Sequence, residues 1–192
     1  TLDPKTHRRT VNDEIALPAG APAEFLLNGN LRLTTSDPAV SEVPLGETEK
    51  FFGINAGASG SGLKLKRYRA AGTPSSVKVS YEGVFDFGLA DQKEEYTRGF
   101  RETSGLLNDQ GVYLAGSGFW YPYLNRELIE FNLDIAQPEG WHVISQGNGT
   151  SRAADGRAKW DSHGPTDEIY LVGGPLRVYR DSAGAVETLA YI

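Results

Sequence analysis

Apolar and polar residues alternate with a period of two in several segments of this chain, and this alternation constrains its fold more than any other feature. The clearest case is residues 129–135, IEFNLDI, in which every odd-numbered residue is apolar and every even-numbered residue is polar. Residues 25–33 and 77–87 also place most of their large apolar side chains on odd numbers. Such alternation is typical of β-strands with one buried face. No segment carries an apolar stripe at the helical period of 3.6 residues.

Turn-forming residues separate these segments. The chain contains 23 Gly and 10 Pro, which mark frequent turns. Residues 57–62 (GASGSG) and 146–156 predict loops, and residues 138–140 (PEG) predict a turn. Many short strands joined by turns are typical of antiparallel sheets. The sequence therefore predicts an all-β fold, with one domain over residues 1–192 built as a multi-stranded antiparallel sandwich or as curved sheets.

Composition excludes several classes of partner and site. The chain has 19 Lys and Arg against 25 Asp and Glu, so its formal net charge is −6, whereas a nucleic-acid-binding domain needs a basic face. It has no Cys, which excludes disulfides, thiolate metal sites and cysteine nucleophiles. No apolar run approaches the roughly 20 residues of a membrane span. We therefore expect no nucleic-acid partner and no membrane span.

The chain also lacks Met, including at position 1. A translated chain starts with Met, so this one is either processed or a piece of something longer. The absence of thiols leaves the redox compartment open. A processed start favours export, to the periplasm or out of the cell, over a cytoplasmic location.

The motifs that carry catalytic chemistry are incomplete in this sequence. His7, His142 and His163 are widely separated, and none belongs to an H-E-x-x-H zinc motif. Ala115 and Phe119 stand where a G-x-S-x-G nucleophile motif requires glycine. From the residues alone we therefore expect no catalytic side chain and no metal site in this chain.

Two segments are unusual in composition. Residues 64–69 (KLKRYR) are basic, and we interpret them as a solvated edge strand whose charge keeps it from pairing with another chain. Residues 119–124 (FWYPYL) hold four aromatic rings in six positions. These rings either pack into the core and its rim or form a recognition surface, since exposed Trp and Tyr are favoured on sugar-binding faces.

Short motifs spread over nearly the whole chain follow one another in a specific order. Near the start stand LDPxxH at residues 2–7 and IxLP at residues 15–18, followed by VKVSYEG at residues 77–83. The later motifs are GVYL at 111–114, WYP at 120–122, the strand 127–135, PxGW at 138–141, VISxG at 143–147, KW at 159–160 and IYLVGGP at 169–175. In this order they resemble the N-terminal domain of the aminopeptidase N family, zinc metallopeptidases that also include leukotriene hydrolase.

The resemblance implies a saddle-like β domain that carries none of the zinc ligands. In that family the H-E-x-x-H helix, the distant Glu ligand and a Gly-x-Met-Glu-Asn segment lie in the next, thermolysin-like domain. Because this chain has no Met, the last of these motifs is not inside it. The resemblance thus implies no cofactor in residues 1–192, and a catalytic domain after residue 192 that binds zinc and hydrolyses peptides.

One departure from the family bears on specificity. The family usually places a Gln or Glu a few residues before the central Pro, on a loop that reaches the active site, where it can bind the substrate's α-amine. Residues 113–121 contain neither, and Asp109 and Gln110 lie upstream. The family's Asp-x-Pro after the central Pro is also missing. The parent is therefore expected to have another peptide preference or to be inactive.

Three functions follow from these readings. In the first, the chain is a non-catalytic domain of a zinc metallopeptidase that braces the catalytic domain and has one apolar flank for it. Its contacts with the substrate end would come from Gln110, Tyr113, Ser117 and Trp120. The alternative is a stand-alone β-sandwich binding module that stacks carbohydrate on Trp120, Tyr121 and Tyr123, which must then be exposed and coplanar. The third is a purely structural or adhesion domain.

Overall fold

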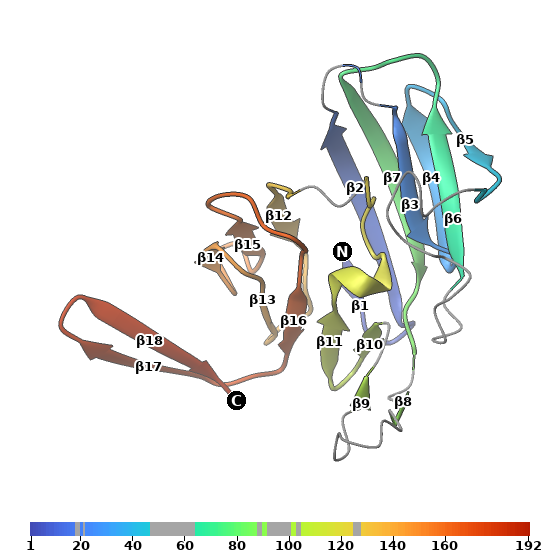
Figure 1. The fold of residues 1–192 in the computed structure, drawn as a ribbon. Coiled ribbons are helices and arrows are strands. Elements are labelled where there is room, and N and C mark those ends of the chain that lie inside the picture. The colour runs from blue at the N-terminus through green and yellow to red at the C-terminus, as the bar shows by residue number, and fades with distance from the viewer. Residues whose placement is uncertain are drawn as a thin grey trace.

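The computed structural model describes residues 1–17, 20, 22–46, 64–87, 90–91, 101–102, 105–124 and 128–192, and Figure 1 shows their arrangement. In chain order the strands are β1 (Leu2–Asp3), β2 (Arg8–Ala16), β3 (Glu24–Asn28), β4 (Leu31–Asp37), β5 (Val40–Val43), β6 (Leu65–Ala70), β7 (Ser76–Val84), β8 (Ala90–Asp91), β9 (Arg101–Glu102), β10 (Leu106–Asn108), β11 (Gly111–Leu114), β12 (Asn132–Ile135), β13 (His142–Ile144), β14 (Asn148–Thr150), β15 (Ala158–Asp161), β16 (Leu171–Gly174), β17 (Val178–Ala183) and β18 (Val186–Tyr191). In the described part of the chain the only helix is one 3₁₀ turn, η1 (Gly116–Gly118), and the strands pair antiparallel. The predicted all-β class is confirmed.

The N-terminal half is formed by two sheets. One has the strand order β1-β2-β7-β4 and the other the order β3-β6-β5, and they lie against each other in Figure 1. Strands β2 and β7 pair over nine residues, from Arg8 opposite Val84 to Ala16 opposite Ser76. The odd-numbered residues of β7 point inward, as the alternation predicts, and Tyr81 is completely buried.

The C-terminal half contains the sheets β10-β11-β16-β13 and β12-β15-β14 and the hairpin β17-β18. Residues 129–135 keep the predicted alternation, because Phe131 and Ile135 are buried and the even-numbered residues are exposed. The buried side chains of both halves form one continuous core. The hairpin extends away from this core in Figure 1, and almost all of its residues are exposed.

Two predictions about local structure are wrong. The basic segment 64–69 is not at an edge, because β6 is the middle strand of its sheet and pairs with β3 and β5. Residues 146–156 are not only a loop, because β14 pairs with β15. This pairing needs a glycine at position 149, where a Cβ atom would lie 2.1 Å from the carbonyl oxygen of Lys159. The predicted loop 57–62 lies outside the described residues.

Candidate functional site

The sheet β10-β11-β16-β13 places four apolar side chains in one row on its outer face. The strand registers put Leu106 opposite Tyr113, Tyr113 opposite Val172, and Val172 opposite Ile144. Directly opposed residues of antiparallel strands share a face of the sheet. Tyr113 and Val172 are 40% and 41% exposed. We call Leu106, Tyr113, Ile144 and Val172 the outer apolar row.

A polar pair lies beside this row. Tyr170 precedes Val172 by two residues, is itself 39% exposed, and its hydroxyl donates a hydrogen bond to Glu168 Oε1. This hydrogen bond, with burial as a smaller cause, raises the pKa of Tyr170 to about 12. Gln146 fixes the segment, because its Oε1 accepts from the Tyr170 amide at 3.0 Å and its Nε2 donates to the Glu168 carbonyl. Glu168 and Tyr170 are therefore held in place at the surface.

Three of the four residues predicted to contact the substrate end lie exposed along one segment. Gln110 is in the turn between β10 and β11, Tyr113 is in the outer apolar row, and Ser117 is on η1. The neighbour of Ser117, Gly116, lies so close to Glu168 that a Cβ atom there would be 2.5 Å from the Glu168 Cβ. The fold thus brings Tyr113 and η1 to the Glu168–Tyr170 pair, while Gln110 lies at the other end of β11.

The fourth predicted residue, Trp120, is 5% exposed. Its indole Nε1 donates to the Ile169 carbonyl at 3.1 Å, and its own carbonyl accepts a hydrogen bond from Arg9. The Arg9 guanidinium carbon lies 5.0 Å from the centroid of the Trp120 ring and 4.5 Å from that of Phe85. These contacts anchor the segment that follows η1 to strand β2, within the core.

Burial also lowers the pKa of Arg9. Arg9 is completely enclosed, and desolvation lowers the pKa of its guanidinium to about 10. Within the described residues its Nε and Nη1 atoms have no hydrogen-bond partner. The Trp120 carbonyl, the nearby Asp13 and the aromatic rings of Tyr81, Phe85 and Trp120 compensate its charge.

The aromatic segment 119–124 has a structural role, and the prediction that it forms a sugar-stacking platform is wrong. Trp120 and Tyr121 are both buried, and their rings are perpendicular, at 86° with centroids 5.1 Å apart. Tyr123 pairs with Leu26 of β3 through two backbone hydrogen bonds, of 2.9 and 3.0 Å. Phe119 and Tyr123 pack on the small cluster that Leu26 forms with Leu65. A stacking platform needs exposed coplanar rings, which these contacts do not allow.

Among the described residues, the groups that this site offers are suited to recognising a ligand. A carboxylate and two phenol hydroxyls beside an apolar row offer hydrogen bonds and packing surface to a polypeptide. Sequence reasoning missed Glu168 and Tyr170. The sequence signal that could have pointed to this surface is the unbroken apolar run 169–172 (IYLV). A strand that is apolar on both faces is typical of a sheet covered on both faces.

Within the described ranges, no three His, Cys, Asp or Glu side chains are grouped so that they could hold a metal ion. These described residues therefore do not fit the zinc that the resemblance implies for the parent. In those same ranges, no helix has the length and hydropathy that crossing a bilayer requires.

Comparison with known proteins supports the fold. No family model matches the sequence, and no curated protein matches it. A two-domain M1 zinc metallopeptidase, solved as a mutant bound to L-arginine, is similar over 98% of this chain and 44% of its own, with a TM-score of 0.54 and 13% identity. An aminopeptidase N family protein from Idiomarina loihiensis is similar over 98% of this chain and 30% of its own, with a TM-score of 0.47 and 13% identity. The chain therefore spans less than half the length of either structure. The resemblance to leukotriene hydrolase stays a prediction.

Proposed function

We propose that this chain is a non-catalytic domain of a zinc metallopeptidase, and that it braces a catalytic domain and forms one wall of its peptide-binding cleft. The outer apolar row carries this proposal. A soluble domain seldom exposes a contiguous apolar patch unless something binds there, and this row lies on a sheet whose opposite face already belongs to the core. The fold likeness to the longer M1 zinc metallopeptidase supports the same assignment.

In this proposal zinc and the cleavage chemistry belong to a catalytic domain outside residues 1–192. That domain is the expected partner, and a peptide is the expected substrate. Tyr113, Ser117 and Gln110 contact the substrate end, since all three are exposed on one segment. Trp120 acts on the substrate only through its neighbours, because it is buried and holds that segment against Ile169 and Arg9. Export to the periplasm or out of the cell remains part of the proposal.

The proposal requires a reading frame that continues past Ile192, and a frame that stops there would refute it. The test compares the 192-residue chain with the longer protein that such a frame encodes. We expect the longer protein to bind zinc and hydrolyse peptides, and the 192-residue chain to do neither. The double substitution Tyr113→Lys and Val172→Lys introduces two charges into the outer apolar row. It should lower the thermal midpoint of the longer protein and reduce its kcat/KM by roughly tenfold or more. The thermal midpoint of the 192-residue chain should remain nearly unchanged.

The matched control is Asn132→Lys together with Asn148→Lys, which adds the same two charges at exposed positions of the sheet β12-β15-β14. This pair should leave the longer protein unaffected. A longer protein without zinc and peptidase activity would refute the proposal. Equal hydrogen exchange of the β11 and β16 amides in both proteins would refute the assignment of the outer apolar row as the docking face.

A further inference from the structure

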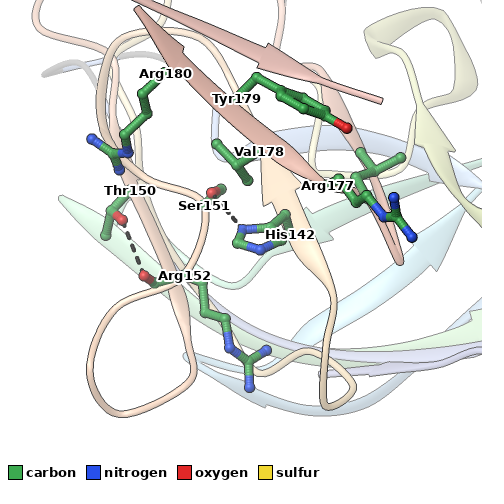
Figure 2. A pocket seen from close by; sticks show the side chains of 9 residues that line it. His142, Thr150, Ser151, Arg152, Arg177, Val178, Tyr179 and Arg180 are labelled. Atoms are coloured by element: carbon green, nitrogen blue, oxygen red, sulfur yellow. Dashed lines mark hydrogen bonds between the residues drawn. The ribbon is translucent and has the colours of Figure 1, made fainter.

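A polar cavity lies between two segments that are far apart in the sequence. Its volume is about 570 Å³, within the range of sites that bind small molecules. One wall comes from β13 and the residues around β14, and the other from the start of β17 and the residues before it. The side chains that line it are His142, Thr150, Ser151, Arg152, Leu176, Arg177, Val178, Tyr179 and Arg180. In Figure 2, His142 and Ser151 lie between the three arginines, which point to different sides.

The cavity is strongly basic although the chain as a whole has a formal net charge of −6. Three arginines line it, and no Asp or Glu does. Arg180 donates to Glu187 at 2.8 Å, but both side chains are more than half exposed, so this ion pair is weak. Within the described residues, the side chain of Arg177 makes no hydrogen bond and no ion pair. The positive charge of the cavity is therefore largely uncompensated.

The histidine in the cavity responds to this charge. His142 Nδ1 lies 3.0 Å from Ser151 Oγ. Partial burial and the nearby Arg152 lower the pKa of the imidazole. A further positive charge at this ring is thus disfavoured, first by burial and then by the charge of Arg152. The hydroxyls of Thr150, Ser151 and Tyr179 add neutral hydrogen-bond donors to the same surface.

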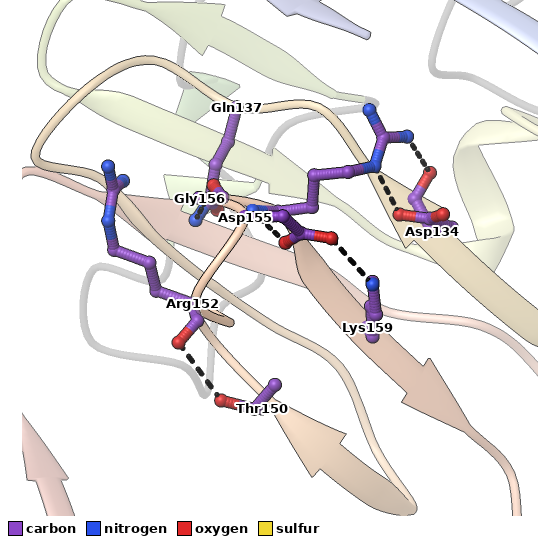
Figure 3. Close-up of polar contacts among 8 residues, drawn as sticks. Asp134, Gln137, Thr150, Arg152, Asp155, Gly156 and Lys159 are labelled. Carbon is purple, nitrogen blue, oxygen red and sulfur yellow. Dashed lines mark hydrogen bonds and ion pairs between the residues drawn. The ribbon is translucent and has the colours of Figure 1, made fainter.

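One wall of the cavity is fixed by side chains that lie outside it. Gln137 Nε2 donates to the carbonyl oxygens of Trp141, Ser151 and Gly156, at 3.1, 2.9 and 3.3 Å. Arg152 uses one nitrogen, Nη1, to donate to the Trp141 carbonyl at 3.2 Å. Figure 3 shows Gln137 reaching into this loop from the preceding segment. The wall that carries Arg152 is therefore already in place before a ligand arrives.

The other wall is the hairpin β17-β18, which has few contacts with the core. Arg177 and Ile192 exchange two backbone hydrogen bonds, of 2.7 and 3.0 Å, at the open end of the hairpin. The ring of Tyr191 lies 6.2 Å from that of His142, and this contact connects the hairpin to β13. A ligand that touches Arg152 on one side and Arg177 or Arg180 on the other would join the hairpin to the body of the domain.

We propose that this cavity binds a small ligand that carries two or more anionic oxygens, of the phosphate or polycarboxylate kind. Guanidinium groups bind such oxygens through charge-assisted hydrogen bonds, often two at a time. The ligand bridges the arginines of the two walls and holds the hairpin in position. This proposal does not depend on the peptidase assignment, because none of the residues that line the cavity belongs to the outer apolar row.

The test is a calorimetric titration of the 192-residue chain with pyrophosphate and, separately, with citrate, in sodium chloride of matched ionic strength. We expect saturable binding of one ligand per chain, with a Kd of about 1 mM or tighter. The double substitution Arg177→Gln and Arg180→Gln should weaken it at least roughly tenfold. Tighter binding of pyrophosphate identifies a phosphoryl ligand, and tighter binding of citrate identifies a carboxylate ligand.

The matched control is Arg157→Gln together with Arg32→Gln, which also removes two surface arginine charges. Arg157 bonds to Asp134 at 2.5 Å, Arg32 bonds to Glu82 at 2.6 Å, and neither lines the cavity, so this variant should bind as the original chain does. Hydrogen exchange of the β17 amides should slow when ligand binds, because the ligand holds the hairpin. Absence of saturable binding overturns the proposal. Equal weakening by the control and the double variant also overturns it, since only net charge would then matter.

Discussion

Strand β6 and the segment that leads into β17 have nearly the same local sequence in two different surroundings. Residues 65–69 read LKRYR and residues 176–180 read LRVYR. In β6, the middle strand of its sheet, Tyr68 is 6% exposed; in β17, one of two strands in a hairpin, Tyr179 is 53% exposed. The local sequence therefore does not decide whether these tyrosines and arginines belong to the core or to a surface. The strands on either side decide it.

The arginines of the two segments differ in the same way. Arg67 is buried, and its Nε and Nη2 lie 2.8 and 2.5 Å from Glu24 Oε2. Arg69 Nε donates to the other oxygen of the same carboxylate at 2.6 Å. One buried glutamate on β3 thus satisfies two arginines of β6. On β17 no buried carboxylate faces the arginines among the described residues, so their charge remains available to a ligand.

The largest effect that separates the two strands should come from Glu24→Gln. The substitution leaves the buried Arg67 charge without its counterion, and loss of one partner of a buried pair costs about 3–5 kcal/mol. The corresponding change on the hairpin, Glu187→Gln, removes only an exposed partner of Arg180 and should cost about 0.5 kcal/mol or less. Urea unfolding of both variants measures the difference in the free energy of unfolding.

A second substitution distinguishes the loss of a counterion from a general disruption of β3. When Arg67→Met is added to Glu24→Gln, no unpaired buried charge remains, and much of the lost stability should return. Equal destabilisation by Glu24→Gln and Glu187→Gln would contradict the comparison. So would a double variant that is less stable than Glu24→Gln alone.

The tyrosines should show the next largest contrast. Tyr68 packs on Phe25 with ring centroids 5.5 Å apart and an interplanar angle of 28°. Tyr68→Ala removes a buried ring and leaves a cavity, so it should cost about 3 kcal/mol in the free energy of unfolding. Tyr179→Ala removes a half-exposed ring from the hairpin and should cost about 0.5 kcal/mol. Thermal unfolding of the two variants checks this, and similar midpoints would show that β17 is packed as firmly as β6.

The sequence predicted those strands in which the alternation of apolar and polar residues alone determines which face is buried. Residues 129–135 and the odd-numbered side chains of β7 lie as their period-two pattern requires, since one apolar face is enough to fix their orientation. The same reasoning gave the all-β class. It did not give the place of β6, because the Glu24 carboxylate that permits burial of Arg67 is 43 residues away in the sequence.

The candidate sites were less predictable for the same reason. Tyr113 and Ser117 were singled out, but Glu168 and Tyr170 reach them only through the pairing of β11 with β16. The basic cavity was not foreseen, because His142 and Arg177 come together only when the hairpin folds beside β13. Trp120 and Tyr121 looked like a binding surface because composition alone cannot tell an exposed ring from one that packs on a buried arginine.

The smallest expected effect concerns pH. The folded-state pKa of His142 is lowered by burial and by Arg152, so the folded chain favours the neutral ring more than the unfolded chain does. Its contribution to stability is therefore complete above the unfolded pKa of about 6.5 and is lost as the pH falls below it. The unfolding free energy of the original chain should fall more steeply between about pH 7 and pH 5 than that of His142→Gln.

An anion bound beside the ring would favour the imidazolium and raise the pKa of His142, so saturating pyrophosphate should bring the two pH profiles together. Profiles that already coincide without ligand would show that neither burial nor Arg152 lowers the pKa of this ring, and the positive potential inferred for the cavity would lose this support.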